Sequence, residues 1–232
     1  MRRVVIDAGH GAHDPGAPGL DGLQEKEVTL DVALRLRDIL KTSGYETILT
    51  RDRDAYLPLE ERTALANTSR GDLFISVHCN ASDAGNLSGV ETYYLNLASS
   101  RRAMATAARE NSMALANMSD LQDLLKEIYS SKMDESSRFA AAVQRSLHGT
   151  LRRKYPDVKD LGVKQAPFYV LIGAQMPSVL AEISFINHKR EGKRLGDPAY
   201  RQLVAQALAD GVKRYVRTVK TADAAAGPRR AP

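Results

Sequence analysis

Two short apolar runs that each end in a histidine constrain the fold of this chain more than any other feature. Residues 4–6 lead into the turn Gly9-His10-Gly11, and residues 73–77 lead into His78. A short apolar run followed by small or polar residues predicts a buried β-strand. Ligands collect outside the carboxyl ends of the strands in an open α/β sheet, so we expect both imidazoles to face one crevice. Alone, His10 is equally explained as a turn histidine without a task.

A carboxylate lies between the two histidines along the chain. Glu25 stands at the start of a helix predicted over residues 27–40. Two histidines and a glutamate with an open fourth position form a ligand set of catalytic zinc, whereas structural zinc sites are closed, usually by cysteines. The one cysteine, Cys79, should point away from a metal that His78 faces, because neighbours on a strand face opposite ways. The pattern predicts a Zn²⁺ site made by His10, Glu25 and His78.

Helix and strand patterns alternate along the chain. Residues 27–40 carry apolar side chains at helical spacing, and the β-forming residues 45–50 follow. This order predicts a right-handed parallel crossover, and hence one α/β domain with a mostly parallel twisted sheet of about six strands flanked by helices. Further predicted elements are helices at residues 59–67, 139–151 and 197–217, strands at 89–95 and 178–183, and an irregular loop that feeds a strand at 162–171.

Several ordered motifs carry a resemblance to a known family. They are residues 6–11 with 14–17, residues 23–26, 50–52, 59–62, 74–81 and 177–187. Over residues 3–217 the chain resembles the zinc-dependent N-acetylmuramoyl-L-alanine amidases, the bacterial cell-wall hydrolases of the Amidase_3 family. The resemblance implies the zinc ligands His10, Glu25 and His78 and a catalytic general base at Glu182. The implied reaction is hydrolysis of the amide between N-acetylmuramic acid and L-alanine in peptidoglycan.

Other charged or ring-bearing residues receive weaker interpretations. The family match implies that Arg51 and Asp52 pair and shape the cleft. Glu91 is expected to be an edge or surface carboxylate, because that is the commoner setting of a mid-strand glutamate. His148 and His188 are expected at the surface.

Composition limits the partners. The formal net charge of +5 would favour anionic polymers without specifying one. Nucleic acid is not expected, since no basic stripe interleaved with aromatic residues is present and the chain has no Trp. No apolar run approaches the roughly 18 residues of a membrane span. The resemblance implies a periplasmic or extracellular protein, and the absence of an export signal suggests that an N-terminal part has been trimmed.

A long stretch in the middle of the chain exceeds what a minimal catalytic domain needs. Residues 96–138 are predicted to be helical and contain four of the six methionines, whose adaptable packing suits a surface that changes partners. An ordinary helical hairpin padding the sheet is the alternative. The predicted catalytic domain spans residues 1–220 with this insertion, and the Ala-, Gly-, Pro- and Arg-rich residues 221–232 are predicted to be disordered.

The insertion also carries a predicted inhibitory residue. Residues 109–111 look like the blocking segment of Gram-negative division amidases. This resemblance implies that a helix covers the zinc, that Glu110 is an inhibitory fourth ligand, and that an activator protein displaces the helix. The alternative is that Glu110 is a solvated helix residue and the insertion is only structural.

The amino-acid sequence leaves two other functions open. Another zinc-dependent peptidase or deacetylase would use the same metal set. A non-catalytic peptidoglycan-binding pseudoamidase would keep the fold, and the loss of a ligand or of Glu182 would be its signature. All four residues are present. An acyl-enzyme mechanism is disfavoured by the single cysteine and the absence of a serine elbow.

Overall fold

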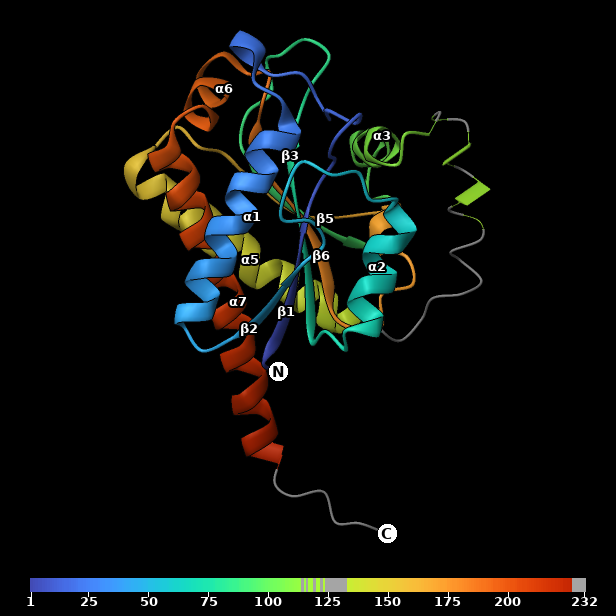
Figure 1. Ribbon diagram of the computed structural model, residues 1–232, viewed down its shortest axis with the longest axis vertical. Coiled ribbons are helices and arrows are strands. Elements are labelled where there is room, and N and C mark those ends of the chain that lie inside the picture. Colours follow the sequence, from blue (N-terminus) through green and yellow to red (C-terminus); the bar gives the residue numbers. More distant parts are fainter. Residues whose placement is uncertain (114, 116, 119, 122, 124–132, 227–232) are drawn as a thin grey trace.

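A six-stranded, mostly parallel sheet forms the centre of the molecule (Figure 1). The computed structural model describes residues 1–113, 115, 117–118, 120–121, 123 and 133–226. The strands are β1 (Arg3–Ala8), β2 (Glu46–Leu49), β3 (Leu73–Asn80), β4 (Val90–Leu95), β5 (Asp160–Ala166) and β6 (Ser178–Phe185). Their order is β2-β1-β3-β6-β4-β5, and only the β4–β6 pair is antiparallel among these strands. The predicted fold class is confirmed.

Helices cover both faces of this sheet (Figure 1). One layer consists of α1 (Glu25–Thr42), α5 (Met133–Lys154) and α7 (Pro198–Ala226). The opposite layer holds α2 (Leu59–Thr68), α3 (Arg101–Glu110) and the short 3-10 helix η2 (Tyr169–Leu171). The remaining described helices are η1 (Leu20–Gly22) and α6 (Lys189–Leu195).

The central strands read as apolar runs because they are buried on both faces. β3 and β6 are buried along their whole length, and β1 is buried after its first residue. Continuous apolar runs are typical of parallel strands covered by helices on both sides. The apolar residues that predict these strands therefore also predict that helices cover both faces of the sheet.

Three predicted boundaries differ from the structure. β5 replaces the start of the loop predicted at residues 162–171, because pairing with β4 gives this weakly patterned segment a strand partner. α5 begins at Met133, before the predicted start at residue 139. α7 continues to Ala226, past the predicted start of disorder at residue 221, since its alanine-rich end favours helix.

Parts of two predicted segments lie outside the described residues. These are residues 114, 116, 119, 122 and 124–132 of the predicted insertion and residues 227–232 of the predicted tail. Within the part of the chain that the structure describes, no helix combines the length and apolar character needed to cross a bilayer.

Candidate metal centre

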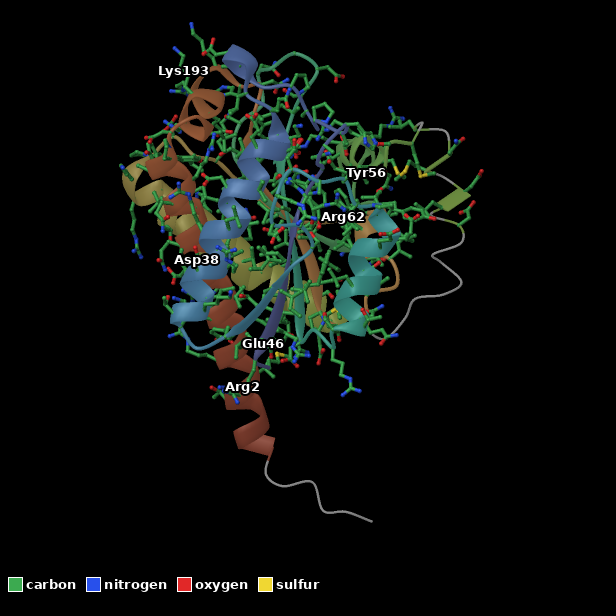
Figure 2. The ribbon with its side chains drawn as sticks, in the orientation of Figure 1. Arg2, Asp38, Glu46, Tyr56, Arg62 and Lys193 are labelled. Carbon is green, nitrogen blue, oxygen red and sulfur yellow. The ribbon has the colours of Figure 1, made fainter. Side chains whose placement is uncertain are left out.

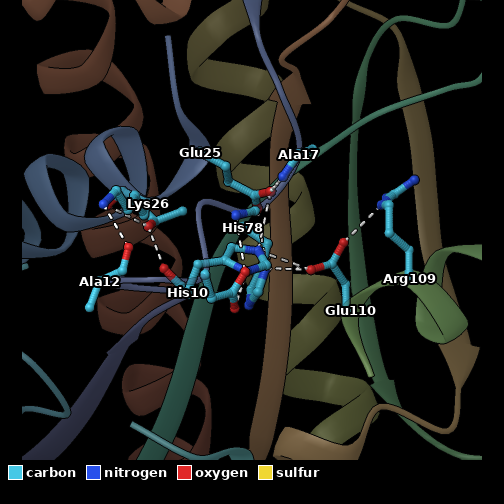
Figure 3. Close-up of polar contacts among 12 residues, drawn as sticks. His10, Ala12, Ala17, Glu25, Lys26, His78, Arg109 and Glu110 are labelled. Atoms are coloured by element: carbon cyan, nitrogen blue, oxygen red, sulfur yellow. Dashed lines mark hydrogen bonds and ion pairs between the residues drawn. The ribbon is translucent and has the colours of Figure 1, made fainter. Parts of the chain in front are cut away.

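Four side chains from four segments converge at the carboxyl edge of β1 and β3 (Figure 3). His10 lies in the turn after β1, with a φ of 62° in the left-handed region that non-glycine residues seldom adopt. His78 lies near the end of β3, Glu25 is the first residue of α1, and Glu110 is the last residue of α3. One ligand atom from each of the four lies within 4.8 Å of all the others.

Glu110 bridges the two histidines. Its Oε2 lies 3.2 Å from His10 Nε2 and 2.9 Å from His78 Nδ1. Glu25 bridges the same two nitrogens from the other side, with Oε2 3.2 Å from His10 Nε2 and Oε1 3.2 Å from His78 Nδ1. The structure thus brings together the three predicted zinc ligands and the predicted inhibitory residue.

This donor set fits a zinc ion. Buried His10 Nε2 and Glu110 Oε2 lie 3.2 Å apart but lack the geometry of a hydrogen bond, so a cation bound between them would satisfy both atoms. His10 Nδ1 lies 2.9 Å from Asp14 Oδ2, the kind of outer carboxylate that fixes the ring of a metal-ligating histidine. Two imidazoles and carboxylates are zinc donors. Cys79 is buried and does not belong to the group, in line with its predicted orientation.

The electrostatics of the centre favour a cation between its carboxylates. Burial alone would lower the pKa of His78, but Glu110 and Glu25 raise it to about 9. The pKa of His10 is also raised, because the charge of Glu25 and the close polar contacts with Asp14 and Glu110 outweigh its burial. Burial opposes ionisation of Glu25, yet the charge of His10 lowers its pKa to about 2. The carboxylates thus stabilise positive charge at the position that a bound metal ion would occupy.

Glycines allow the close packing of this centre. A Cβ built on Gly9 would lie 2.4 Å from the His78 ring. A Cβ on Gly16 would lie 2.6 Å from His10 and 2.7 Å from Glu25, and Gly16 also has a φ of 70°. Gly9 and Gly16 therefore leave space for the ligand side chains that a Cβ would displace.

The predicted base, Glu182, lies beside His78 in the sheet. The two residues are register partners across β3 and β6. Glu182 is fully buried and neither carboxylate oxygen has a hydrogen-bond partner. Burial, reinforced by the negative charge of Glu110, raises the pKa of Glu182 well above the usual glutamate value. Such a carboxyl is costly to bury without a task.

Two buried arginines hold the turn that carries His10. Arg51 donates to the carbonyls of Ala8 and Gly9 at 2.9 and 2.8 Å. Arg62 donates to the carbonyls of Ala8 and His10 at 2.7 and 3.0 Å. The expected pairing of Arg51 with Asp52 is wrong, because the guanidinium turns inward to backbone carbonyls. In the sequence, Arg62 is marked only by its place in the amidase motif at residues 59–62. That motif by itself indicates no role for Arg62.

The balancing charge for Arg62 comes from β1. Asp7 Oδ1 lies 2.9 Å from Arg62 Nη1, and both residues are buried. Thr50 and Ser76 each donate a hydroxyl hydrogen bond of 2.6 Å to the Asp7 carboxylate. Burial opposes this charge, but Arg62 and the two hydroxyls lower the pKa of Asp7 below its ordinary value.

Glu91 is not an edge or surface residue, and that expectation is wrong. β4 lies between β6 and β5, so Glu91 is fully buried. Its carboxylate accepts a bond from Asn80 Nδ2 at 2.6 Å and pairs with Arg102 of α3 at 2.6 Å and with Lys164 of β5. Two cations and an amide donor therefore compensate its burial, and one cation comes from the helix that ends in Glu110.

The other histidines lie outside the metal-capable group. His188 caps α6 by accepting from the backbone N–H of Glu191 at 3.4 Å, and His148 Nδ1 lies 3.4 Å from Asp160 Oδ2. Both are half-buried, slightly more enclosed than predicted.

Two hollows flank Glu110, and both reach His10. One has a volume of about 430 Å³ and is also lined by Ser82, Arg109 and Asn187. The other has a volume of about 330 Å³ and is also lined by Tyr56. The end of α3 therefore stands between two spaces beside the same centre.

The fold and the site together define an enzyme domain of the hydrolase class. The chain belongs to the Amidase_3 family, described as N-acetylmuramoyl-L-alanine amidase, which matches residues 4–214. The reaction is hydrolysis of the amide between N-acetylmuramic acid and L-alanine of peptidoglycan. This agrees with the reaction expected from the sequence motifs.

Individual relatives agree with this assignment. The chain is 34% identical to the amidase AmiA of Escherichia coli, over 92% of this chain and 76% of AmiA. It is 35% identical to the amidase LytC of Bacillus subtilis, over 92% of this chain but only 35% of LytC. The solved structure of the amidase AmiC2 of Nostoc punctiforme superposes with a TM-score of 0.71 at 29% identity, covering 93% of this chain and 97% of that one.

Proposed function

We propose that this chain is a zinc-dependent peptidoglycan amidase held in a self-inhibited state. The observation that carries the proposal is the position of Glu110, whose carboxylate bridges the two histidines of a His-Glu-His set. A catalytic zinc site keeps a fourth position for water, and Glu110 occupies that space.

His10, His78 and Glu25 would hold the zinc ion. A bound Zn²⁺ lowers the pKa of a coordinated water toward neutrality and polarises the scissile carbonyl. Asp14 fixes the imidazole of His10, and the backbone N–H groups of Ala17 and Cys79 hold the carboxylate of Glu25 at 2.8 and 2.7 Å. These contacts support a centre whose ligands are oriented before substrate arrives.

Glu182 would act as the general base. It lies next to His78 across the sheet, and its oxygens have no hydrogen-bond partner to compete for a proton. The carboxylate would take the proton of the attacking water and pass it to the leaving amine of L-alanine. Glu182 does not belong to the metal-capable group, so its role is separate from ligation.

The end of α3 would inhibit the enzyme by occupying the substrate's space. Arg109 supports the blocking position by donating to the carbonyl of Ala81 at 2.8 Å and to Asn80 Oδ1 at 3.0 Å. An activator protein that binds α3 and the insertion would withdraw Glu110. Because peptidoglycan lies outside the cytoplasmic membrane, we assign the enzyme to the periplasm or the extracellular space.

Digestion of purified peptidoglycan, followed by mass analysis of the products, tests this function. The expected products are free stem peptides that begin with L-alanine and glycan strands with intact lactyl groups. Release should stop with a chelator and return with zinc. Cleavage inside the stem peptide, or loss of acetyl groups without peptide release, would instead assign a zinc peptidase or deacetylase.

A further inference from the structure

An exposed aromatic pair stands at the rim of the site. The ring of Tyr56 lies 4.2 Å from that of His13, tilted by 40°. Tyr56 keeps 46% of its surface exposed, and His13 is exposed as well. Neither side chain has a task in the metal centre described above. The two tilted rings, each with a polar edge, are open to solvent.

Polar contacts fix the two loops that carry this pair. Asp54 accepts hydrogen bonds from the backbone N–H of Ala12 at 2.7 Å and from Lys26 Nζ at 2.8 Å, and Lys26 also donates to the carbonyl of Ala12. A Cβ on Gly11 would lie 2.0 Å from the carbonyl oxygen of Ala55, so the loops are in direct backbone contact there. A surface held in place before binding loses less entropy when a ligand arrives.

Tyr56 of this pair lines a hollow beside the metal-capable group. Tyr56 lines the hollow of about 330 Å³ that reaches His10 and His78. In Figure 2 Tyr56 lies beside the end of α3, above α2. Glu110, Asn111 and Ser112 line the same hollow as Tyr56, so the hollow would widen when Glu110 withdraws.

The two hollows differ in the arginine that each offers to a peptidoglycan substrate. Asp14 and Glu110 line both; the hollow of Tyr56 adds Glu60 and Arg62, and the other hollow adds Asp83 and Arg109. Asp7 and backbone carbonyls already bind the buried guanidinium of Arg62, whereas the side chain of Arg109 is partly exposed. A stem peptide carries carboxylates of its own, and the hollow of Tyr56 offers them no exposed arginine. A muramyl residue in the substrate is neutral, because its lactyl carboxyl is in the amide bond.

We propose that Tyr56, supported by His13, is the sugar-binding platform of a glycan subsite beside the metal centre. The C–H face of a pyranose ring packs on an aromatic face, and the tyrosine hydroxyl remains free to bind a sugar hydroxyl. This proposal rests on the proposed function. It places the glycan strand in the hollow of Tyr56 and directs the stem peptide toward the hollow of Ser82 and Asn187.

The test measures glycan binding apart from hydrolysis. Zinc-loaded protein is titrated with a peptide-free tetrasaccharide of alternating N-acetylglucosamine and N-acetylmuramic acid whose lactyl carboxyls are converted to neutral amides, and separately with free stem peptide, while the Tyr56 and His13 ring signals are followed by NMR. The wild type should bind the tetrasaccharide, and Tyr56→Ala should weaken that binding about tenfold. Tyr56→Phe should keep it within about threefold. Tyr56→Leu, which keeps apolar bulk without a flat ring, should behave like Tyr56→Ala.

Hydrolysis kinetics with polymeric peptidoglycan provide a second readout. Tyr56→Ala should raise KM and leave kcat nearly unchanged, because the platform binds a part of the substrate away from the scissile bond. The proposal is overturned if wild-type protein does not bind the tetrasaccharide, if Tyr56→Ala binds it as well as wild type, or if only stem-peptide binding weakens. These outcomes are distinct from failure of the proposed function, which product analysis of the wild type reveals.

Discussion

At the scale of single residues, two buried glutamates a short distance apart have opposite surroundings. Glu110 lies against two imidazoles, and although burial opposes its charge, His78 and His10 hold its pKa well below the usual value. Glu182 has no such partner, and burial raises its pKa well above that value. These opposite directions agree with the proposed roles of Glu110 as a blocking ligand and of Glu182 as the general base.

Glu182→Gln should separate these two roles. The amide keeps the shape of the side chain but cannot accept the proton of water, so turnover should fall by about 100-fold or more. Zinc content, measured by atomic absorption on the purified variant, should equal that of wild type. Loss of zinc in step with activity would show that Glu182 is a metal ligand.

Arg62→Lys should weaken metal binding although Arg62 is no ligand. A lysine has one ammonium and cannot bond Asp7 and the carbonyls of Ala8 and His10 together, so the strained turn of His10 loosens. Disturbing such an outer support should cost about 10–100-fold in zinc affinity, measured by competition with a fluorescent chelator.

The matched control is Arg35→Lys, whose guanidinium pairs with Asp31 at the surface of α1, away from the centre. Circular dichroism should show that both variants are folded. Zinc affinity of Arg62→Lys equal to that of the control would contradict a supporting role for Arg62.

At the scale of secondary-structure elements, α3 is attached in a way that permits release. Its buried apolar side chains are the small Ala103, Ala107 and Ala108, and the partly exposed Met104 packs against the same cluster. Much of the remaining attachment is polar, including the Arg102–Glu91 pair and the contacts of Arg109. A partner that supplies a larger apolar surface would outweigh these contacts.

Removing the block should activate the isolated domain. Glu110→Ala should raise the initial rate of peptidoglycan hydrolysis, because the metal gains an open position. Arg102→Ala should raise it less, because α3 loses its ion pair with Glu91 while Lys164 and Asn80 still compensate that buried carboxylate. Arg101→Ala, an exposed position on the same turn, serves as the control. Unchanged rates for both Glu110→Ala and Arg102→Ala, with zinc bound, would refute self-inhibition by α3.

Glu191 links the elements behind the site in a pH-dependent way. Its carboxylate accepts from the backbone N–H groups of Gly89 and Phe185 at 2.8 and 2.7 Å. Burial nevertheless raises the pKa of Glu191 from 4.5 to about 7. The folded state thus retains a proton that the unfolded state has lost, so this contribution to stability is present at low pH and disappears as the pH rises through about 7.

Urea unfolding of the wild type and Glu191→Gln at pH 5 and pH 8 checks this sign. Between these pH values the wild type should lose about 2–3 kcal/mol more in free energy of unfolding than the variant, which cannot titrate. The comparison uses the change in free energy of unfolding between the two pH values in each protein. It therefore excludes the constant effect of the hydrogen bonds that the substitution alters. Equal changes in the two proteins would mean that Glu191 titrates normally in the folded protein.

At the scale of the whole molecule, the metal would join parts of the chain that are far apart in sequence. His10, Glu25, His78 and Glu110 come from the β1 turn, α1, β3 and α3, so one ion ties both helical layers to the sheet. A ligand that binds only the folded state stabilises the entire cooperative unit.

Zinc should therefore raise the thermal midpoint of the whole domain. At a free zinc concentration 100 times Kd the added stability is about 2.7 kcal/mol, which corresponds to about 5–10 °C in Tm for a chain of this size. Calorimetry of chelated and zinc-loaded protein measures it. His78→Ala should show little response, and an equal response in that variant would place the stabilising metal elsewhere.

The sequence by itself determined the sheet centre and the convergence of the two histidines. β1 and β3 are buried on both faces, so their apolar residues form continuous runs that can be read locally. Parallel strand ends meet at one edge, which made the meeting of His10 and His78 a consequence of topology. The amidase resemblance added Glu182 and Glu110, which the structure places beside them.

Only the tertiary structure decided which polar residues serve this centre and how. Glu91 has the local pattern of an edge carboxylate, but its cations come from α3 and from β5, the latter 73 residues away along the chain. Arg62 binds Asp7 across 55 residues, and β5 is a strand because β4 offers it a partner. Burial and pairing between distant segments depend on the packed fold, and no local pattern of residues encodes them.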